Sequence, residues 1–199
     1  MFPSRFSPYV NTANRSCRAT QPEKQGFYIT ESFKRFLKST DGTLLEWEEW
    51  FEEHHPNSVQ LGTDVLMNLL RKDWPPEGGV QGRSPKDVEN DVALWVYDLM
   101  VTKTYEGLTI QCAVLPDIAK RLGLPFRESS TAEESRGIDG WIGKYPVSLK
   151  PDSFKEKRIV IEEFDAPIVF YHKRKCGGVA YDATAFYESL DEVDQVEYD

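Results

Sequence analysis

The chain has 199 residues with a formal net charge of −9, and 40% of its residues are hydrophobic. This length is sufficient for one sizeable core, or for one domain with a smaller lobe, and the apolar share excludes a disordered chain. No apolar run reaches the length of a membrane span, and the first residues lack the apolar stretch of a secretory signal.

Cysteine and histidine usage indicates the cellular setting. The three cysteines, Cys17, Cys112 and Cys176, are odd in number and widely spaced, which argues against a disulfide framework. The three histidines, His54, His55 and His172, do not have zinc-ligand spacing. We therefore expect a reducing, cytoplasmic setting.

The charges are distributed unevenly along the chain. Residues 1–40 carry seven Lys/Arg against two acids, and residues 144–175 carry eight against five. Residues 181–199 hold seven acids and no basic residue. Two basic regions and one acidic end are typical of a protein with a phosphate-facing side. Solvated surface charge is an equally good explanation of the same pattern.

Apolar residues recur at helical spacing over several stretches. They predict helices over residues 25–37, 44–55, 59–72, 84–99 and 104–123. Thr43 with Glu46 three residues later is a capping-box signature, so the second of these helices begins after Thr43. Pro116 lacks a backbone donor and is predicted to kink or restart the last helix. Asp117 is therefore interpreted as part of a helix start and not as a catalytic acid.

Residues 74–85 are rich in Pro and Gly and predict a flexible loop or lobe boundary. After residue 137 the spacing of apolar residues changes from the helical repeat of about 3.6 residues to the alternation of a strand. Further strands are predicted over 158–164 and 167–173, with a Gly177-Gly178 turn before residues 179–186. This order predicts an α/β or α+β sheet domain with a mainly helical N-terminal lobe. The predicted divisions are an N-terminal lobe over 1–83, a core over 84–187 and a solvated acidic tail over 188–199.

A β-hairpin is predicted within residues 137–150, with Gly143-Lys144 as a type II′ turn. Ile142 then pairs with Tyr145, and Asp139 falls opposite Ser148. Because side chains alternate along a strand, Lys150 shares the face of Ser148. The other face carries an apolar set suited to a core: Ile138, Ile142, Tyr145, Val147 and Leu149.

One face of this hairpin thus gathers a carboxylate and an amine. This is the geometry of a metal-dependent phosphodiester nuclease, in which Asp139 binds Mg²⁺ and Lys150 stabilises negative charge or positions the attacking water. A weak surface ion pair between Asp139 and Lys150 is the simpler alternative.

The order of a helix with a Glu, an Asp on a strand and x-Lys on the next strand resembles the PD-(D/E)xK nuclease superfamily. More specifically, the chain resembles the MjaI family of type II restriction endonucleases over roughly residues 10–185. The segments that carry this resemblance are 11–15 (NTANR), 19–26 (ATQPEKQG), 46–51 (EWEEWF), 104–108 (TYEGL), 133–140 (EESRGIDG) and 145–151 (YPVSLKP). The resemblance implies a restriction-endonuclease-like mixed sheet flanked by helices.

The resemblance places Asp139 and Lys150 in the catalytic positions of an Mg²⁺-dependent enzyme. Ser148 stands where the superfamily has Asp or Glu, so a carboxylate from elsewhere is needed to complete the metal site. Glu106 is the first choice, because the preceding helix of the family supplies an acid, and Glu134 and Glu162 are the alternatives.

Side chains that pair with adenine or guanine in the major groove gather near the N-terminus: Asn11, Asn14, Arg15, Arg18, Gln21, Lys24 and Gln25. A polar loop without a ligand is the competing explanation. Lys144 and Lys155 are expected to contact the DNA backbone.

The resemblance also implies cleavage of double-stranded DNA at a short palindromic site and therefore a homodimer, together with a companion DNA methyltransferase acting on the same site. The alternatives are a structure-specific or repair nuclease of the same superfamily, and a non-catalytic DNA-binding module.

Overall fold

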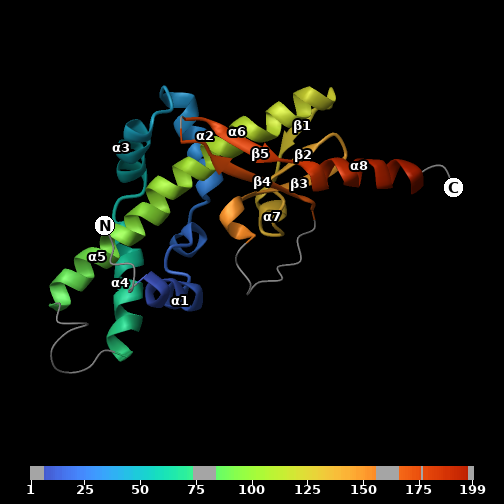
Figure 1. The fold of residues 1–199 in the computed structure, drawn as a ribbon. Helices are drawn as coiled ribbons and strands as arrows, with labels where there is room; N and C mark the ends of the chain where they lie inside the picture. Colours follow the sequence, from blue (N-terminus) through green and yellow to red (C-terminus); the bar gives the residue numbers. More distant parts are fainter. Residues whose placement is uncertain (1–6, 74–83, 156–165, 176, 197–199) are drawn as a thin grey trace. The chain divides into compact units, whose positions relative to one another are not determined.

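The computed structural model describes residues 7–73, 84–155, 166–175 and 177–196 (Figure 1). The chain forms two compact units, Met1–Leu108 and Thr109–Asp199, and each is described by itself. The division follows Leu108 and not residue 83, because the helix that begins at Pro85 packs with the N-terminal helices. Within the described ranges, no helix combines the length and the apolar character needed to cross a bilayer.

The first unit consists of helices (Figure 1). They are α1 (Ser7–Cys17), the 3-10 helix η1 (Pro22–Gln25), α2 (Ile29–Ser39), α3 (Leu44–His54), α4 (Ser58–Leu70), the 3-10 helix η2 (Arg71–Asp73), α5 (Pro85–Tyr97), the π-helical turn η3 (Asp98–Thr102) and the start of α6 (Lys103–Leu122). The predicted capping box at Thr43 is confirmed, since Thr43 and Glu46 exchange side-chain to main-chain hydrogen bonds. A second capping box joins Ser84 and Asp87 at the start of α5.

An aromatic cluster fills the core of this unit. The indole of Trp47 is fully buried and donates from Nε1 to the carbonyl of Val101 at 3.1 Å. The rings of Phe33 and Phe36 meet Trp47 edge to face, with centroids 5.3 and 5.2 Å away. Buried aromatic pairs of this kind each stabilise a fold by about 0.5–1.5 kcal/mol beyond area burial.

Three predicted helices differ from those in the structure. The predicted helix over 25–37 begins only at Ile29, because Gly26 adopts a left-handed conformation (φ 87°) that ends η1. The predicted helices over 84–99 and 104–123 are joined through the π-helical turn of η3.

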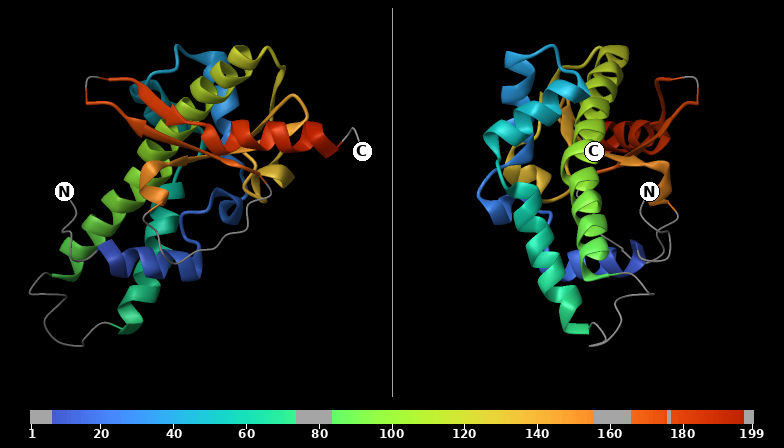
Figure 2. Two further views of the ribbon diagram at one scale, coloured as in Figure 1. Left: turned by 45° about the vertical axis from the view of Figure 1, so that its right-hand side comes forward. Right: turned by 90° about the vertical axis from the view of Figure 1, so that its left-hand side faces the viewer.

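The second unit holds the rest of α6 and a five-stranded sheet. Its elements are β1 (Phe126–Glu128), α7 (Thr131–Glu134), β2 (Gly140–Ile142), β3 (Tyr145–Pro151), the 3-10 helix η4 (Asp152–Phe154), β4 (Ile168–Lys173), β5 (Val179–Asp182) and α8 (Thr184–Val196). The strand order is β1-β2-β3-β4-β5, with β3 and β4 parallel and the other neighbours antiparallel. Figure 2 shows the hairpin of β4 and β5 and the helix α8 that follows it. The predicted mixed α/β fold is confirmed.

The predicted hairpin register is also confirmed. Ile142 pairs with Tyr145, and Gly140 pairs with Val147, which leaves Asp139 next to Ser148. Gly143 has φ 61°, whereas Lys144 is not among the described residues with positive φ. A type I′ turn needs positive φ at both central positions, so these φ signs fit the predicted type II′ turn and not type I′.

Helices α6 and α8 cover one face of the sheet. Leu115 and Ile118 of α6 pack with Leu149 and Val169 of the central strands, and Phe186 of α8 joins the same cluster. Pro116 lies inside α6, which continues without a restart, so the interpretation of Pro116 and Asp117 as a helix start is wrong, whereas the alternative of a kink stays a prediction. The absence of one helix hydrogen bond is offset because Val114, Leu115 and Ile118 around Pro116 are buried in this core.

The C-terminal segment begins as a strand and continues as a helix. Strand β5 ends at Asp182, because the Asp182 carboxylate accepts hydrogen bonds from the main chain and hydroxyl of Thr184 (3.1 and 2.7 Å) and α8 begins there. Residues 188–196 belong to α8, and Leu190 packs against the core. The predicted strand over 158–164 lies outside the described residues.

Candidate active site

The carboxylate of Asp139 is the centre of a polar cluster on the sheet. Its Oδ2 atom accepts from Nζ of Lys150 at 2.9 Å and from the main-chain N–H of Leu149 at 2.7 Å. The hydroxyl of Ser148 donates to the same oxygen at 3.3 Å. Within the described ranges of the chain, none of these hydrogen bonds uses Oδ1, so one carboxylate oxygen remains able to bind a further ligand.

The hairpin explains why these side chains meet. Asp139 directly precedes β2, and its N–H donates to the carbonyl of Val147 on β3 at 2.8 Å. The N–H of Leu149, two residues further along β3, would lack a strand partner where β2 begins, and the Asp139 carboxylate accepts its hydrogen bond instead. Buried main-chain donors require such a partner.

The site is partly screened from solvent. The side chains of Asp139 and Lys150 are each 21% exposed, and Ser148 is completely buried. The polar face of the hairpin is therefore not an open, wet surface. Because the local dielectric is lower than that of water, charges here interact more strongly than an exposed ion pair does.

A glutamine from α6 completes the support of Asp139. Nε2 of Gln111 donates to the main-chain carbonyl of Asp139 at 2.7 Å, and this contact is partly buried. Gln111 was not among the residues predicted from the sequence, because a single polar residue on a helix gives no signal of a contact 28 residues away.

The acids predicted to complete the metal site have different surroundings. Glu106 lies on α6 in the first unit and forms an ion pair with Lys103 at 3.0 Å. Glu134 is the last residue of α7, and Glu162 lies outside the described residues. Among the residues that the structure describes, no group of three or more His, Cys, Asp or Glu side chains could hold a metal ion.

Two of the N-terminal candidates for DNA recognition have structural roles. The amide of Asn14 donates to the hydroxyl of Thr20 at 2.8 Å and accepts from the Thr20 N–H at 3.1 Å. Nε2 of Gln25 donates to the carbonyl of Ser58 at 3.1 Å. Both amides hold the chain between α1 and α4, so they are poorly placed to contact bases.

The other N-terminal candidates are on the surface. Asn11, Arg15, Arg18, Gln21 and Lys24 are all exposed. Arg18 has φ 54°, a left-handed conformation that ends α1. These five side chains are accessible to a ligand.

The two lysines predicted to contact the DNA backbone differ in environment. Lys144 is exposed in the hairpin turn, 5.5 Å from the ring centroid of Tyr145. Lys155 lies 3.0 Å from a carboxylate oxygen of Asp152 and 4.3 Å from the ring centroid of Phe170. The Lys155 ammonium also lowers the pKa of the Asp152 carboxyl. Since Asp152 offsets its charge, Lys155 is less suited to bind phosphate than it would be without this ion pair.

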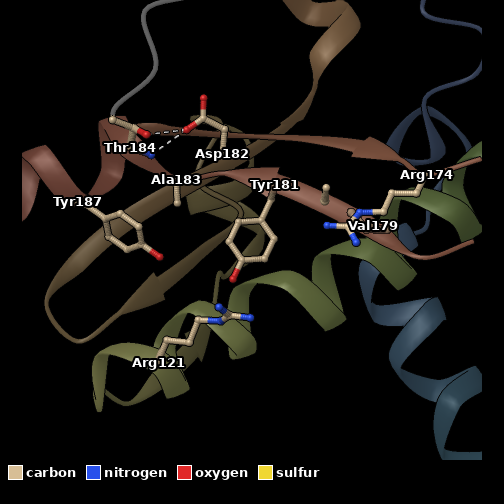
Figure 3. Close-up of a pocket in the computed structure, with 9 residues that line it drawn as sticks. Arg121, Arg174, Val179, Tyr181, Asp182, Ala183, Thr184 and Tyr187 are labelled. Atoms are coloured by element: carbon tan, nitrogen blue, oxygen red, sulfur yellow. Dashed lines mark hydrogen bonds between the residues drawn. The ribbon is translucent and has the colours of Figure 1, made fainter.

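A pocket of about 430 Å³ lies at the edge strand β5 (Figure 3). Its lining comes from α6, β5, α8 and the residue after β4, and it includes Arg121, Arg174, Tyr181 and Tyr187. Tyr181 packs against the core on the face of the sheet that α6 covers. The register places Tyr181 beside Tyr171 and Tyr171 beside Pro151, so Tyr181 shares the face of Pro151. Lys150, the residue before Pro151, faces the other side. The pocket is therefore on the other face of the sheet from the Asp139 cluster, and none of the predicted site residues lines it.

A mixed sheet with helices on one face and a paired aspartate and lysine on the other is the arrangement of a restriction-endonuclease-like nuclease. Comparison with known proteins agrees with this class. The chain belongs to the MjaI restriction endonuclease family, whose model matches residues 7–181. Membership makes it a restriction endonuclease, an enzyme that cuts DNA at specific sequences.

Two relatives cover most of the chain. The type II restriction enzyme MjaI of Methanocaldococcus jannaschii is 32% identical over 178 residues, which are 87% of this chain and 77% of that protein. The type II restriction enzyme MthZI of Methanothermobacter thermautotrophicus is 33% identical over 175 residues, 87% of this chain and 81% of that protein. No solved structure gives a match.

Proposed function

We propose that this protein hydrolyses both strands of double-stranded DNA at a short palindromic site, with Asp139 and Lys150 as its catalytic pair. The observation that carries the proposal is the 2.9 Å contact between these two side chains in a chain of the MjaI restriction endonuclease family. A surface ion pair would not need the further hydrogen bond from the Leu149 N–H, which fixes the carboxylate in place.

Lys150 supplies positive charge where negative charge develops on the attacked phosphate. Its ammonium is held by Asp139 and is only partly exposed, so it needs little reorganisation when the reaction occurs. Ser148 donates to the same carboxylate oxygen and is buried, which makes it a support for Asp139 and not a metal ligand.

Type II restriction endonucleases generally use a divalent metal ion, and we propose Mg²⁺ for this protein. The residues fit such an ion in one respect: Asp139 offers a hard carboxylate oxygen, Oδ1, that the hydrogen bonds of the site do not use. Mg²⁺ is commonly held by only one or two carboxylates and keeps several waters. When bound, it would polarise the phosphate and lower the pKa of a water ligand. Glu106 and Glu134 remain the proposed additional ligands.

The exposed residues of the N-terminal segment, Asn11, Arg15, Arg18, Gln21 and Lys24, are the proposed DNA-recognition surface. Arginine pairs with guanine and asparagine or glutamine with adenine in the major groove. Asn14 and Gln25 are proposed to affect recognition only by holding this segment in its conformation.

A palindromic site is matched by a twofold homodimer, with one active site for each strand. A methyltransferase of the same specificity is the proposed companion that protects the host DNA.

Incubation of the purified protein with plasmid and viral DNA in Mg²⁺ buffer tests the proposal. Discrete, reproducible fragments are expected. A smear, or cutting confined to junctions, would instead identify a structure-specific or repair nuclease. Intact DNA with a mobility shift would identify a binding module and refute the catalytic proposal.

A further inference from the structure

Helix α6 contacts the main chain at the point where Asp139 enters β2. Gln111 and Leu115 are four residues apart on α6 and therefore share a side of the helix. Nε2 of Gln111 reaches the carbonyl of Asp139 at 2.7 Å. Leu115 lies over the next residue, Gly140, where a Cβ atom would be 2.9 Å from the Cδ1 atom of Leu115.

This close packing depends on the glycine. A Cβ at Gly140 would also lie 2.9 Å from a ring carbon of Phe126, so a larger residue would force the side chains of Leu115 and Phe126 to shift. The amide of Gln111 bonds to the carbonyl of Asp139 directly beside this packing contact. Gly140 and Gln111 together therefore join α6 to the strand that carries Asp139.

The contact fixes the backbone of Asp139 on both sides. Its N–H donates to the carbonyl of Val147, and its carbonyl accepts from Gln111. With the backbone held, only the two side-chain torsions of Asp139 remain free, and three donors fix Oδ2. Reactive groups must be held within a fraction of an ångström, and an error of about 1 Å can cost about 100-fold in rate.

We infer that Gln111 is a positioning residue for DNA cleavage, which it supports by holding the main chain of Asp139. This inference rests on the proposed function, because it assigns Gln111 a role at the same site. Gln111 does not touch the reacting groups. It acts through Asp139, whose carboxylate in turn binds Lys150 and the Leu149 N–H.

A merely structural glutamine would affect stability alone. A positioning glutamine affects two further quantities. The first is hydrogen exchange of the Leu149 amide, which is protected by the Asp139 carboxylate and can be measured by NMR without metal or DNA. The second is kcat for DNA cleavage, which should fall while KM stays constant, because the DNA-binding surface is unchanged.

The test compares Gln111→Met with Gln60→Met. Methionine keeps the length and helix propensity of glutamine but cannot donate a hydrogen bond. Gln60 is an exposed helical glutamine whose Nε2 bonds to Asp64 on its own helix at 2.8 Å, so its replacement is the matched control. We expect Gln111→Met to lower kcat by about 10- to 100-fold and to speed Leu149 exchange by about tenfold or more. Gln60→Met should match the wild type in both.

A second variant, Gln111→Glu, covers the case in which Gln111→Met fails to fold. Glutamate keeps the size of the side chain but turns an acceptor toward the Asp139 carbonyl, so kcat should fall at least as far. Wild-type kcat in a folded Gln111 variant, with or without faster Leu149 exchange, would overturn the inference. The proposed function would still stand after that outcome, provided that the wild-type protein cuts DNA and Asp139→Asn does not. Full cutting by Asp139→Asn would refute the proposed function instead.

Discussion

The Nζ atom of Lys150 lies 2.9 Å from Oδ2 of Asp139, although the two residues are eleven positions apart and a hairpin turn lies between them. Exposed ion pairs contribute only about 0–1 kcal/mol to stability, so this pair would matter little on an open surface. Here both side chains are only 21% exposed, and the carboxylate also accepts a main-chain hydrogen bond at 2.7 Å. The acid and the amine are therefore held in place before any substrate arrives.

Replacing Asp139 with asparagine should abolish DNA cleavage while leaving the fold intact. The amide keeps the shape of the side chain, and its oxygen can still accept from the Leu149 N–H, but it carries no charge to bind a metal ion. Cleavage assays and circular dichroism measure the two effects. Asp117→Asn is the matched control, because Asp117 binds Arg121 and Tyr181 and lies outside the site. Full cutting by Asp139→Asn would remove this residue from the mechanism.

Replacing Lys150 with alanine should lower kcat by about 100- to 1,000-fold, the usual effect of removing one charge-stabilising donor. DNA binding at equilibrium should change little, since the N-terminal surface is untouched. Single-turnover cleavage and a mobility-shift assay separate these quantities. Lys144→Ala, in the turn of the same hairpin, is the control and should retain catalysis once DNA is bound. A Lys150→Ala enzyme with wild-type kcat would contradict the assignment.

Removal of divalent metal should stop cleavage without releasing DNA. Asp139 and Lys150 remain in place without the ion, but the proposed activation of the attacking water by the metal is then lost. EDTA should abolish cutting, excess Mg²⁺ should restore it, and a mobility shift should persist throughout. Cutting that continues at full rate in EDTA would exclude the proposed dependence on Mg²⁺.

Arg15→Ala and Arg18→Ala should each weaken DNA binding and change its dependence on salt. Both side chains are exposed, and removing one phosphate-binding side chain reduces the slope of log K against log salt by about 1. If either arginine reads a guanine, its replacement should instead relax specificity at one base position. Arg71→Ala is the control, because the exposed Arg71 pairs with Glu89 at 2.8 Å. Equal effects of all three variants would argue against a special role for the N-terminal segment.

Asn14→Ala should destabilise the protein, in contrast to the arginine variants. Both ends of its amide bond to Thr20, and removing a partly buried hydrogen-bonding group costs about 1–3 kcal/mol. Urea unfolding measures this free energy. A variant with unchanged stability but altered sequence preference would return Asn14 to the set of base-reading residues.

The contact between Tyr181 and Asp117 should make stability depend on alkaline pH. Burial, together with the hydrogen bond to Asp117, raises the pKa of Tyr181 from 10.0 to about 12. The folded state therefore retains the phenolic proton longer than the unfolded state does. The stabilisation from Tyr181 is complete below pH 10 and disappears as the pH rises toward 12.

Urea unfolding of the wild type and Tyr181→Phe across this range measures the effect. The stability difference between them should shrink as the pH rises through the interval. A constant difference would show that the hydroxyl does not titrate as described. Cleavage by Tyr181→Phe at neutral pH should match the wild type, since Tyr181 faces away from the Asp139 cluster.

The sequence by itself determined the local features of this protein. The Gly143 turn and the twofold apolar period fix the hairpin register, and with it the meeting of Asp139 with Lys150, because a turn and its flanking residues interact over short separations. The capping box at Thr43 followed from four adjacent residues for the same reason.

Only the tertiary structure decided the features that depend on distant packing. It buried Ser148, carried α6 through Pro116 and brought Gln111 to the carbonyl of Asp139. Each of these results from close packing between elements far apart in the chain, which can outweigh local propensity and leaves no periodic trace in the sequence.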